Sequence, residues 1–295
     1  MEDPRSTNPI TLNRLLFATD FSAASNTAFE YAKSIATRYS AQMYVVHVID
    51  LDVFDLLSSE STTELLQQAH EQARQKIAGM LTTRGVPSDQ CHIIVTHGVV
   101  PEALTGIVRQ HDIDLAVLGT HGRRAFKKLL LGSVAEEVFR LSPCPVLTVG
   151  PKAAPVAAKT QLQHVLYPVE FAPDLSDAAK YAISLAERYG AKLTIMKVAE
   201  DMPTSANKRE PFPMPAGRWI EDHISKSSDL PSRLSFERGF GPAAKAILNF
   251  ASNAAVDVIV IGIEPQDPTI AAHLPKSDTA YELVSRSQCP VLTIR

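Results

Sequence analysis

Three glycines and a serine stand at fixed spacing within residues 115–149. Gly119 is followed after two residues by Gly122, and nine residues separate Gly122 from the pair Gly132-Ser133, a G-x2-G-x9-G-S pattern. Glycine has no Cβ, so its backbone can approach a ligand closely. A helix that starts there offers unpaired N–H groups with partial positive charge, and a serine adds a hydroxyl donor. These residues suit the binding of a phosphate group.

The elements around this motif are those that a phosphate site needs. The apolar run 115–118 predicts a buried strand, and a helix with Val134, Val138 and Leu141 on one face begins at Gly132-Ser133. A single glycine of this kind is more often ordinary turn punctuation. The complete pattern between a strand and a helix favours the phosphate site.

The residues between the glycines leave two interpretations open. Arg123, Arg124, Lys127 and Lys128 form either a solvated cationic face or a loop from which one or two side chains reach a terminal phosphate. His121 is compatible with a phosphate contact and with a solvent-facing position.

A second candidate is Asp20, which directly follows the predicted strand 15–19. A carboxylate repels phosphate, so it would better accept hydrogen bonds from an adenine N–H or from ribose hydroxyls. The alternative is an N-cap for the next helix, a role that Ser22 also suits.

The motif around Gly119 and the run Ala18-Thr19-Asp20-Phe21-Ser22 resemble the nucleotide-binding signature of the universal stress protein family. The resemblance implies that ATP or another adenine nucleotide is bound, with any Mg²⁺ carried by its phosphates. It places the backbone of Val48 at the adenine edge and Gly98 beside the base or ribose. The residues expected at the nucleotide are Ala18, Thr19, Asp20, Val48, Gly98, Leu118, Gly119, His121, Gly122, Gly132, Ser133 and Val134.

The pattern along the chain predicts an α/β fold. Strands are expected at residues 15–19, 43–49, 91–95, 115–118 and 145–149, with helical patterns between them. This alternation is typical of a doubly wound parallel sheet, which binds ligands at the carboxyl ends of its strands. The family resemblance implies the strand order 3-2-1-4-5.

The whole pattern then occurs a second time. Residues 165–171 resemble residues 15–21, and residues 289–294 nearly repeat 144–149. Gly239 takes the place of Gly98 in this alignment. We therefore expect a tandem pair of universal-stress-like domains, 9–150 and 160–295, joined by a linker rich in Pro and Ala.

The second domain has lost the phosphate motif. Ser277-Asp278 stands at the place of Gly132-Ser133, and Glu170 stands at the place of Asp20. Prolines within residues 203–215 predict that one helix is shortened or replaced by a loop. This domain is expected to be structural or regulatory, and binding of another ligand is left open.

Composition narrows the classes of function. The 295 residues are 45% hydrophobic with a formal net charge of −3, which gives no reason to expect binding to nucleic acid. No apolar run is long enough to span a membrane. The three cysteines form no C-x-x-C pair, so we expect buried, inert thiols and a reducing cytoplasm. His70, His92, His97 and His111 show no metal-ligand spacing, and no metal site is assigned.

Three functions remain. The first is an ATP-binding stress or regulatory protein. The second is a slow ATP-hydrolysing enzyme, for which the chain shows no evident general base or paired nucleophile. The third is a scaffold or interaction protein without nucleotide. The resemblance also implies that the closing strands of the two halves pair as an internal pseudo-dimer, while a homodimer and unknown protein partners are left open.

Overall fold

The computed structural model describes residues 10–50, 59–120, 132–153, 161–169, 177–199, 224–225, 228–263 and 279–295, without the side chains of residues 59–62 and 133. The chain forms two compact units, an N-terminal unit at Leu12–Pro151 and a C-terminal unit at Lys152–Arg295.

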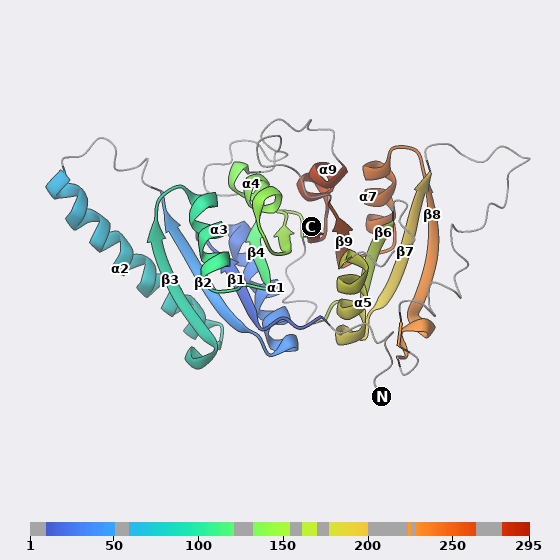
Figure 1. The fold of residues 1–295 in the computed structure, drawn as a ribbon, viewed down its shortest axis with the longest axis horizontal. Helices are drawn as coiled ribbons and strands as arrows, with labels where there is room; N and C mark the ends of the chain where they lie inside the picture. The colour runs from blue at the N-terminus through green and yellow to red at the C-terminus, as the bar shows by residue number, and fades with distance from the viewer. Residues whose placement is uncertain are drawn as a thin grey trace, which may run out of the picture. The chain divides into compact units, whose positions relative to one another are not determined.

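The N-terminal unit is built on a parallel sheet, shown in Figure 1. Its described strands run in the order β3-β2-β1-β4-β5, which confirms the expected order 3-2-1-4-5. The strands are β1 (Arg14–Ala18), β2 (Gln42–Ile49), β3 (Cys91–His97), β4 (Leu115–Gly119) and β5 (Val146–Val149).

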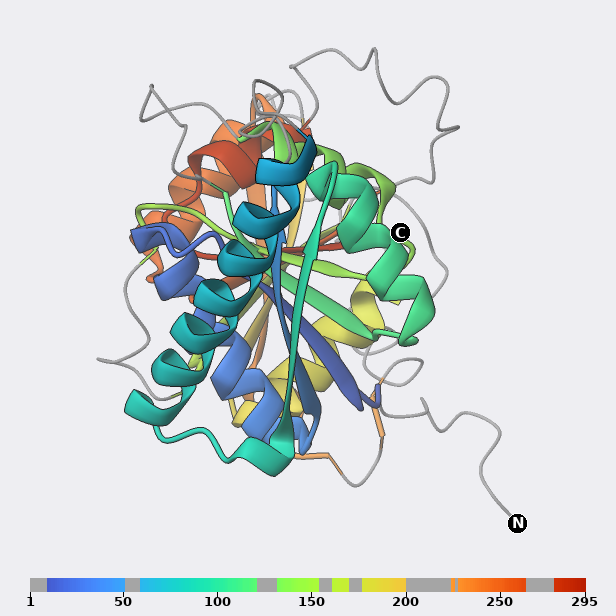
Figure 2. The same cartoon turned by 90° about the vertical axis from the view of Figure 1, so that its left-hand side faces the viewer.

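Helices cover both faces of this sheet. They are α1 (Ala23–Tyr39), α2 (Ser59–Thr83), α3 (Val100–Gln110) and α4 (Ser133–Leu141), with a short 3-10 turn, η2, at Ser88–Gln90. Figure 2 shows α1 and α2 on one side of the sheet and α3 and α4 on the other. This is the doubly wound arrangement, in which the strand order reverses between β1 and β4.

Local sequence signals explain where the helices begin and end. Ser22 is the N-cap of α1 and accepts a hydrogen bond from the backbone N–H of Ser25 at 3.1 Å. Helix α2 ends two residues before Gly85, whose φ of +63° is a left-handed conformation that glycine adopts without strain. Pro101 lies in the first turn of α3, where no intrahelical N–H is required.

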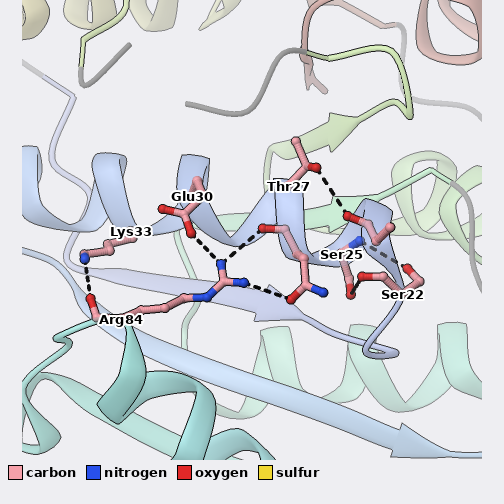
Figure 3. Close-up of polar contacts among 8 residues, drawn as sticks. Ser22, Ser25, Thr27, Glu30, Lys33 and Arg84 are labelled. Carbon is pink, nitrogen blue, oxygen red and sulfur yellow. Dashed lines mark hydrogen bonds and ion pairs between the residues drawn. The ribbon is translucent and has the colours of Figure 1, made fainter. Parts of the chain in front are cut away.

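The residue that follows α2 ties it to α1. The Arg84 guanidinium forms an ion pair with Glu30 and donates to the side-chain oxygen of Asn26 at 3.1 Å. It also lies 4.8 Å from the centre of the Phe29 ring, and Lys33 donates to the Arg84 carbonyl. Figure 3 shows the ion pair of Arg84 with Glu30 and the bond from Lys33 to the Arg84 carbonyl, which join α1 to the end of α2.

The buried face of α4 differs from the predicted one. Ala135, Val138 and Phe139 are each 2% exposed, whereas Val134 and Leu141 are half-buried. Spacings of three and four residues put the first three on one stripe of the helix. Of the three residues that the sequence predicted on the buried face, only Val138 is buried, because it lies on both the predicted stripe and the observed one.

The C-terminal unit repeats the plan. Read from the far edge, its strands follow the order β8-β7-β6-β9-β10. With β6 counted as the first strand of the repeat, this is again 3-2-1-4-5. The described elements are β6 (His164–Val169), α5 (Asp177–Tyr189), β7 (Lys192–Ala199), η4 (Leu230–Arg233), β8 (Leu234–Phe240), α7 (Ala243–Asn253), β9 (Val258–Gly262), α9 (Thr279–Arg286) and β10 (Val291–Ile294). The internal duplication is thus confirmed as a duplicated fold.

Backbone hydrogen bonds correct one detail of the alignment between the copies. Gly98 donates to the Ile49 carbonyl at 3.0 Å, and Gly241 donates to the Ala199 carbonyl at 2.9 Å. Both glycines have positive φ and follow the third strand of their unit. Gly98 therefore corresponds to Gly241, not to Gly239. The sequence match with Gly239 came from a proline three residues later in both copies, but strand pairing determines the register.

One carboxylate in each copy fastens the start of the first strand to the start of the fourth. Asp114 Oδ2 accepts the backbone N–H groups of Asn13 and Arg14 at 2.7 and 2.9 Å. Asp257 makes the corresponding pair of bonds to the start of β6 at 2.7 and 3.0 Å.

Several expectations lie outside the described residues. These concern Glu170, residues 203–215 and Ser277-Asp278 of the second copy. The pairing of the two closing strands stays a prediction.

Candidate functional site

The carboxyl ends of the strands in the N-terminal unit form one continuous edge. Thr19, just past β1, donates its backbone N–H to the Val46 carbonyl of β2 at 2.9 Å. Thr120, just past β4, donates to the Val149 carbonyl of β5 at 3.0 Å. Ladder-type bonds thus continue beyond the strands, so the residues after β1 and β4 lie at a fixed place on this edge.

Strand order reverses between β1 and β4. Ala18 lies opposite Leu118 in the register of these two strands. Thr19 is 6% exposed and Leu118 is 4% exposed, while Ala18 is half-buried. Open parallel sheets bind ligands at this position.

Gly119 brings the start of α1 against the end of β4. A Cβ placed on Gly119 would lie 3.0 Å from the carbonyl carbon of Ala24 and 3.0 Å from the backbone nitrogen of Ser25. These atoms belong to the first turn of α1. The absence of a side chain at Gly119 is therefore required by helix packing, independently of any ligand.

Gly132 is hydrogen-bonded to Thr120, the residue that precedes segment 121–131 of the motif. Its backbone N–H donates to the Thr120 carbonyl at 2.8 Å, and a Cβ at Gly132 would lie 2.8 Å from the same oxygen. The residues that precede and follow 121–131 are thus hydrogen-bonded neighbours. Any larger residue at position 132 would push this contact apart.

The two helix N-termini at this edge are capped differently. Figure 3 shows the Ser22 side chain beside Ser25 at the first turn of α1. The N-cap of α4 is Gly132, and among the described residues no side chain caps that helix. The first N–H groups of α4 therefore form the positive end of a helix that no described side chain caps, at the reversal point.

Asp20 takes part in a local turn. Its Oδ1 accepts the backbone N–H of Ser22 at 3.0 Å, while Thr19 Oγ1 accepts that of Phe21 at 3.0 Å. The helix cap itself is Ser22. Asp20 is half-buried, and its carboxylate lies on the edge between the ends of β1 and α1.

Three further side chains at this edge were not singled out from the sequence. The ring of Phe21 lies 4.6 Å from that of His47, and Lys76 Nζ lies 4.2 Å from the centre of the Phe21 ring. His47 Nδ1 is 2.7 Å from the Thr19 carbonyl, so this nitrogen carries the proton and donates. Phe21 belongs to the motif run 18–22 and His47 directly precedes Val48, whereas Lys76 offered no sequence signal.

Phe21 has a backbone conformation that large residues rarely adopt. Its φ is +61°. Such a conformation costs on the order of 1–3 kcal/mol, and residues of this kind cluster at functional sites.

Two of the remaining predicted residues, Val48 and Gly98, lie at the ends of β2 and β3. Val48 is half-buried next to the end of β2. Gly98 has a φ of +129° with no atom within 4 Å of the place where a Cβ would be, so its backbone faces open space. His121, Gly122 and the basic segment lie outside the described residues, and Ser133 opens α4 with its side chain outside them.

Two kinds of feature, a metal-binding cluster and a membrane-spanning helix, are absent from the described residues. They contain no group of three or more His, Cys, Asp or Glu side chains arranged to hold a metal ion. None of their helices is both long enough and apolar enough to cross a membrane.

Known proteins resemble both units. The sequence model described as "Universal stress protein family" matches residues 11–150 and 161–295. Universal stress protein MJ0531 of Methanocaldococcus jannaschii is 32% identical over 140 residues, covering 46% of this chain and 81% of that protein. A universal stress protein of Thermus aquaticus is 33% identical over 135 residues, covering 46% of this chain and 96% of that protein. The crystal structure of a universal stress protein from Archaeoglobus fulgidus covers 97% of both chains with a TM-score of 0.71 and 21% identity, which shows a shared fold.

Proposed function

We propose that this chain, which belongs to the universal stress protein family, binds an adenine nucleotide in its N-terminal unit. ATP is the proposed ligand. Its binding would regulate the protein's shape or its choice of partner in a stress response.

The observation that carries this proposal is the start of α4 near the end of β4, where no described side chain caps the helix. Helix α4 starts at Gly132, which has no side chain to cap it and is held 2.8 Å from the Thr120 carbonyl. Uncapped N–H groups and the helix dipole attract an anion, and a phosphate group fits this environment. Gly122 and Ser133 join the phosphate side through their place in the sequence motif.

The other end of the nucleotide would lie toward β1, β2 and β3. The Asp20 carboxylate, whose Oδ1 accepts the Ser22 N–H, would accept hydrogen bonds from ribose hydroxyls or adenine N–H groups. Val48 would face the base with its backbone, and Gly98 leaves open space beside it. Any Mg²⁺ would be held chiefly by the phosphates and by water.

The proposal is tested by changing the charge of Asp20 while keeping its shape. Asp20→Asn still offers Oδ1 to the Ser22 N–H, so the local turn should persist. The loss of a charge-assisted hydrogen bond should weaken ATP binding by about tenfold or more. Isothermal titration with ATP, cAMP, adenosine and tripolyphosphate would separate the base from the phosphate contributions.

Asp112→Asn is the matched control. The Asp112 side chain is 85% exposed and pairs with Arg14 at the opposite edge of the sheet, so the same change of charge should leave ATP affinity unchanged. Equal loss in both variants would assign the effect to general electrostatics. Absence of binding by the unmodified chain would leave the scaffold function, and phosphate release that scales with protein would point to hydrolysis.

A further inference from the structure

Two histidines from different elements of the N-terminal unit lie side by side. His70 comes from α2 and His97 is the last residue of β3. Nε2 of His70 is 3.2 Å from Nδ1 of His97, and the ring centres are 5.4 Å apart with planes inclined at 74°. The two residues are 27 positions apart, so no short sequence motif links them.

One arrangement that fits the distance between the two nitrogens is a hydrogen bond between the rings. Two neutral imidazoles can meet with one nitrogen as donor and the other as acceptor. The same distance suits a second arrangement. Two nitrogens bound to one tetrahedral zinc ion, each at about 2.0–2.1 Å, stand roughly 3.3 Å apart. The folded chain therefore holds two imidazole nitrogens at the spacing of a metal chelate.

We propose that His70 and His97 bind a divalent transition-metal ion such as Zn²⁺ or Ni²⁺. Nε2 of His70 and Nδ1 of His97 are the protein ligands, and water fills the remaining positions. Imidazole nitrogen is a preferred ligand of these ions. A site with two protein ligands and open positions exchanges its metal, unlike a closed structural site with four.

The surroundings of the pair allow a metal to enter. His97 is exposed and His70 is half-buried. Metal binding requires neutral imidazoles. Burial of His70 and the nearby charge of Arg74 lower the pKa of His70. Arg74 also repels a metal ion, so the affinity should be moderate.

The second copy provides a natural comparison. Gly98 corresponds to Gly241, so Phe240 stands at the place of His97. A phenylalanine cannot ligate a metal, and the proposed site belongs to the N-terminal copy. His97 directly precedes Gly98, so a bound metal would join α2 to the edge of the candidate nucleotide site. The metal proposal itself does not depend on nucleotide binding.

Titration of the full chain with ZnCl2 or NiCl2, without nucleotide, tests the site by calorimetry at pH 7.5. We expect one binding event per chain that becomes at least about tenfold weaker in His70→Gln and in His97→Phe, which copies the second unit. His92→Gln is the matched control because His92 is also exposed on β3. Identical titrations for all variants, or an equal loss in His92→Gln, would overturn the proposal.

Thermal unfolding gives a second readout on the same proteins. A metal that bridges α2 and β3 binds the folded state and should raise the unfolding temperature of the unmodified chain and of His92→Gln. The rise should vanish in His70→Gln and His97→Phe, whose exposed or half-buried positions leave the fold intact without metal. A rise that persists in both site variants would assign the metal to other histidines and refute the pair.

Discussion

His164 shows how one residue sets a pH response in the C-terminal unit. Its Nδ1 is 3.1 Å from the Ala254 carbonyl, which can only accept, so Nδ1 carries the proton. Nε2 then accepts from Thr194 Oγ1 at 2.7 Å, and Thr194 in turn lies 2.8 Å from Ser235 Oγ. The ring is 7% exposed, and burial lowers the pKa of His164 from its usual 6.5.

Because the folded pKa of His164 is lowered, the protein should become less stable as the pH falls. Above pH 6.5 the residue is neutral in both states, and its contribution to the free energy of unfolding is fully present. As the pH falls below 6.5 the unfolded chain takes up a proton that the folded chain resists, so stability decreases until the pH reaches the lowered folded pKa. Urea unfolding between pH 7.5 and 5.0 should show this decrease. His164→Gln should flatten it, whereas a slope as steep as that of the unmodified chain would contradict the assignment.

At the residue scale, the sequence predicted the burial of cysteine side chains better than it predicted which side chains contact one another. The expected buried thiols are found at Cys144 and Cys289, where burial raises the pKa of each thiol to about 11. Cys91 is only half-buried, although its pKa is also raised to about 11. Neighbours such as Lys76 against Phe21 could not be predicted, because the two residues come from segments more than fifty positions apart and depend on tertiary packing.

At the element scale, the two copies provide matched glycines at the end of their fourth strands. A Cβ on Gly119 would lie 3.0 Å from backbone atoms of α1, whereas among the described residues a Cβ on Gly262 would meet the Ala178 Cβ at 3.6 Å, an ordinary contact distance. Gly119→Ala should therefore shift the first turn of α1 and lower the free energy of unfolding by about 1–3 kcal/mol. Gly262→Ala should change it little. Chemical denaturation measures both, and equal effects would refute the packing argument.

The carboxylates that fasten the strands offer a second test at this scale. Asp114→Asn keeps the shape but loses the charge that strengthens two backbone hydrogen bonds, so the free energy of unfolding should fall by about 1 kcal/mol or more. Asp112→Asn, two residues earlier, removes only an exposed ion pair and should cost less than about 0.5 kcal/mol. Similar losses in the two variants would show that the bonds of Asp114 contribute nothing specific.

Elements were predicted more reliably than their faces and alignments. Hydrophobic periodicity and turn residues predicted the alternating strands and helices, because they determine element type. The strand order, which the structure confirms in both copies, was implied by the family resemblance. The predicted buried stripe of α4 and the predicted match of Gly98 with Gly239 were wrong, since Gly98 corresponds to Gly241. Both depend on register, which strand hydrogen bonds and helix packing decide.

At the scale of the whole molecule, the two copies share a fold but not the phosphate motif. Both units keep the sheet order and the strand-fastening aspartate. The sequence motif for phosphate occurs only in the first copy. The proposed consequence is that ligand binding should act on one half of the chain while the other half remains unchanged.

Hydrogen exchange provides a map of that asymmetry. Saturating ATP with Mg²⁺ should protect backbone amides after β1 and at the start of α4, because ligand binding suppresses local opening. Peptides from β6 to β10 should exchange at the same rate with and without nucleotide. Equal protection of both units would contradict a site confined to the N-terminal unit.

The most direct test of the central claim is the number of nucleotides held by one chain. Native mass spectrometry of the full chain with ATP, for the unmodified protein and for Asp20→Asn, measures this number without assuming any activity. We predict one adenine nucleotide per chain in the unmodified protein and a marked loss of occupancy in Asp20→Asn. No bound nucleotide, or undiminished occupancy in Asp20→Asn, would contradict it.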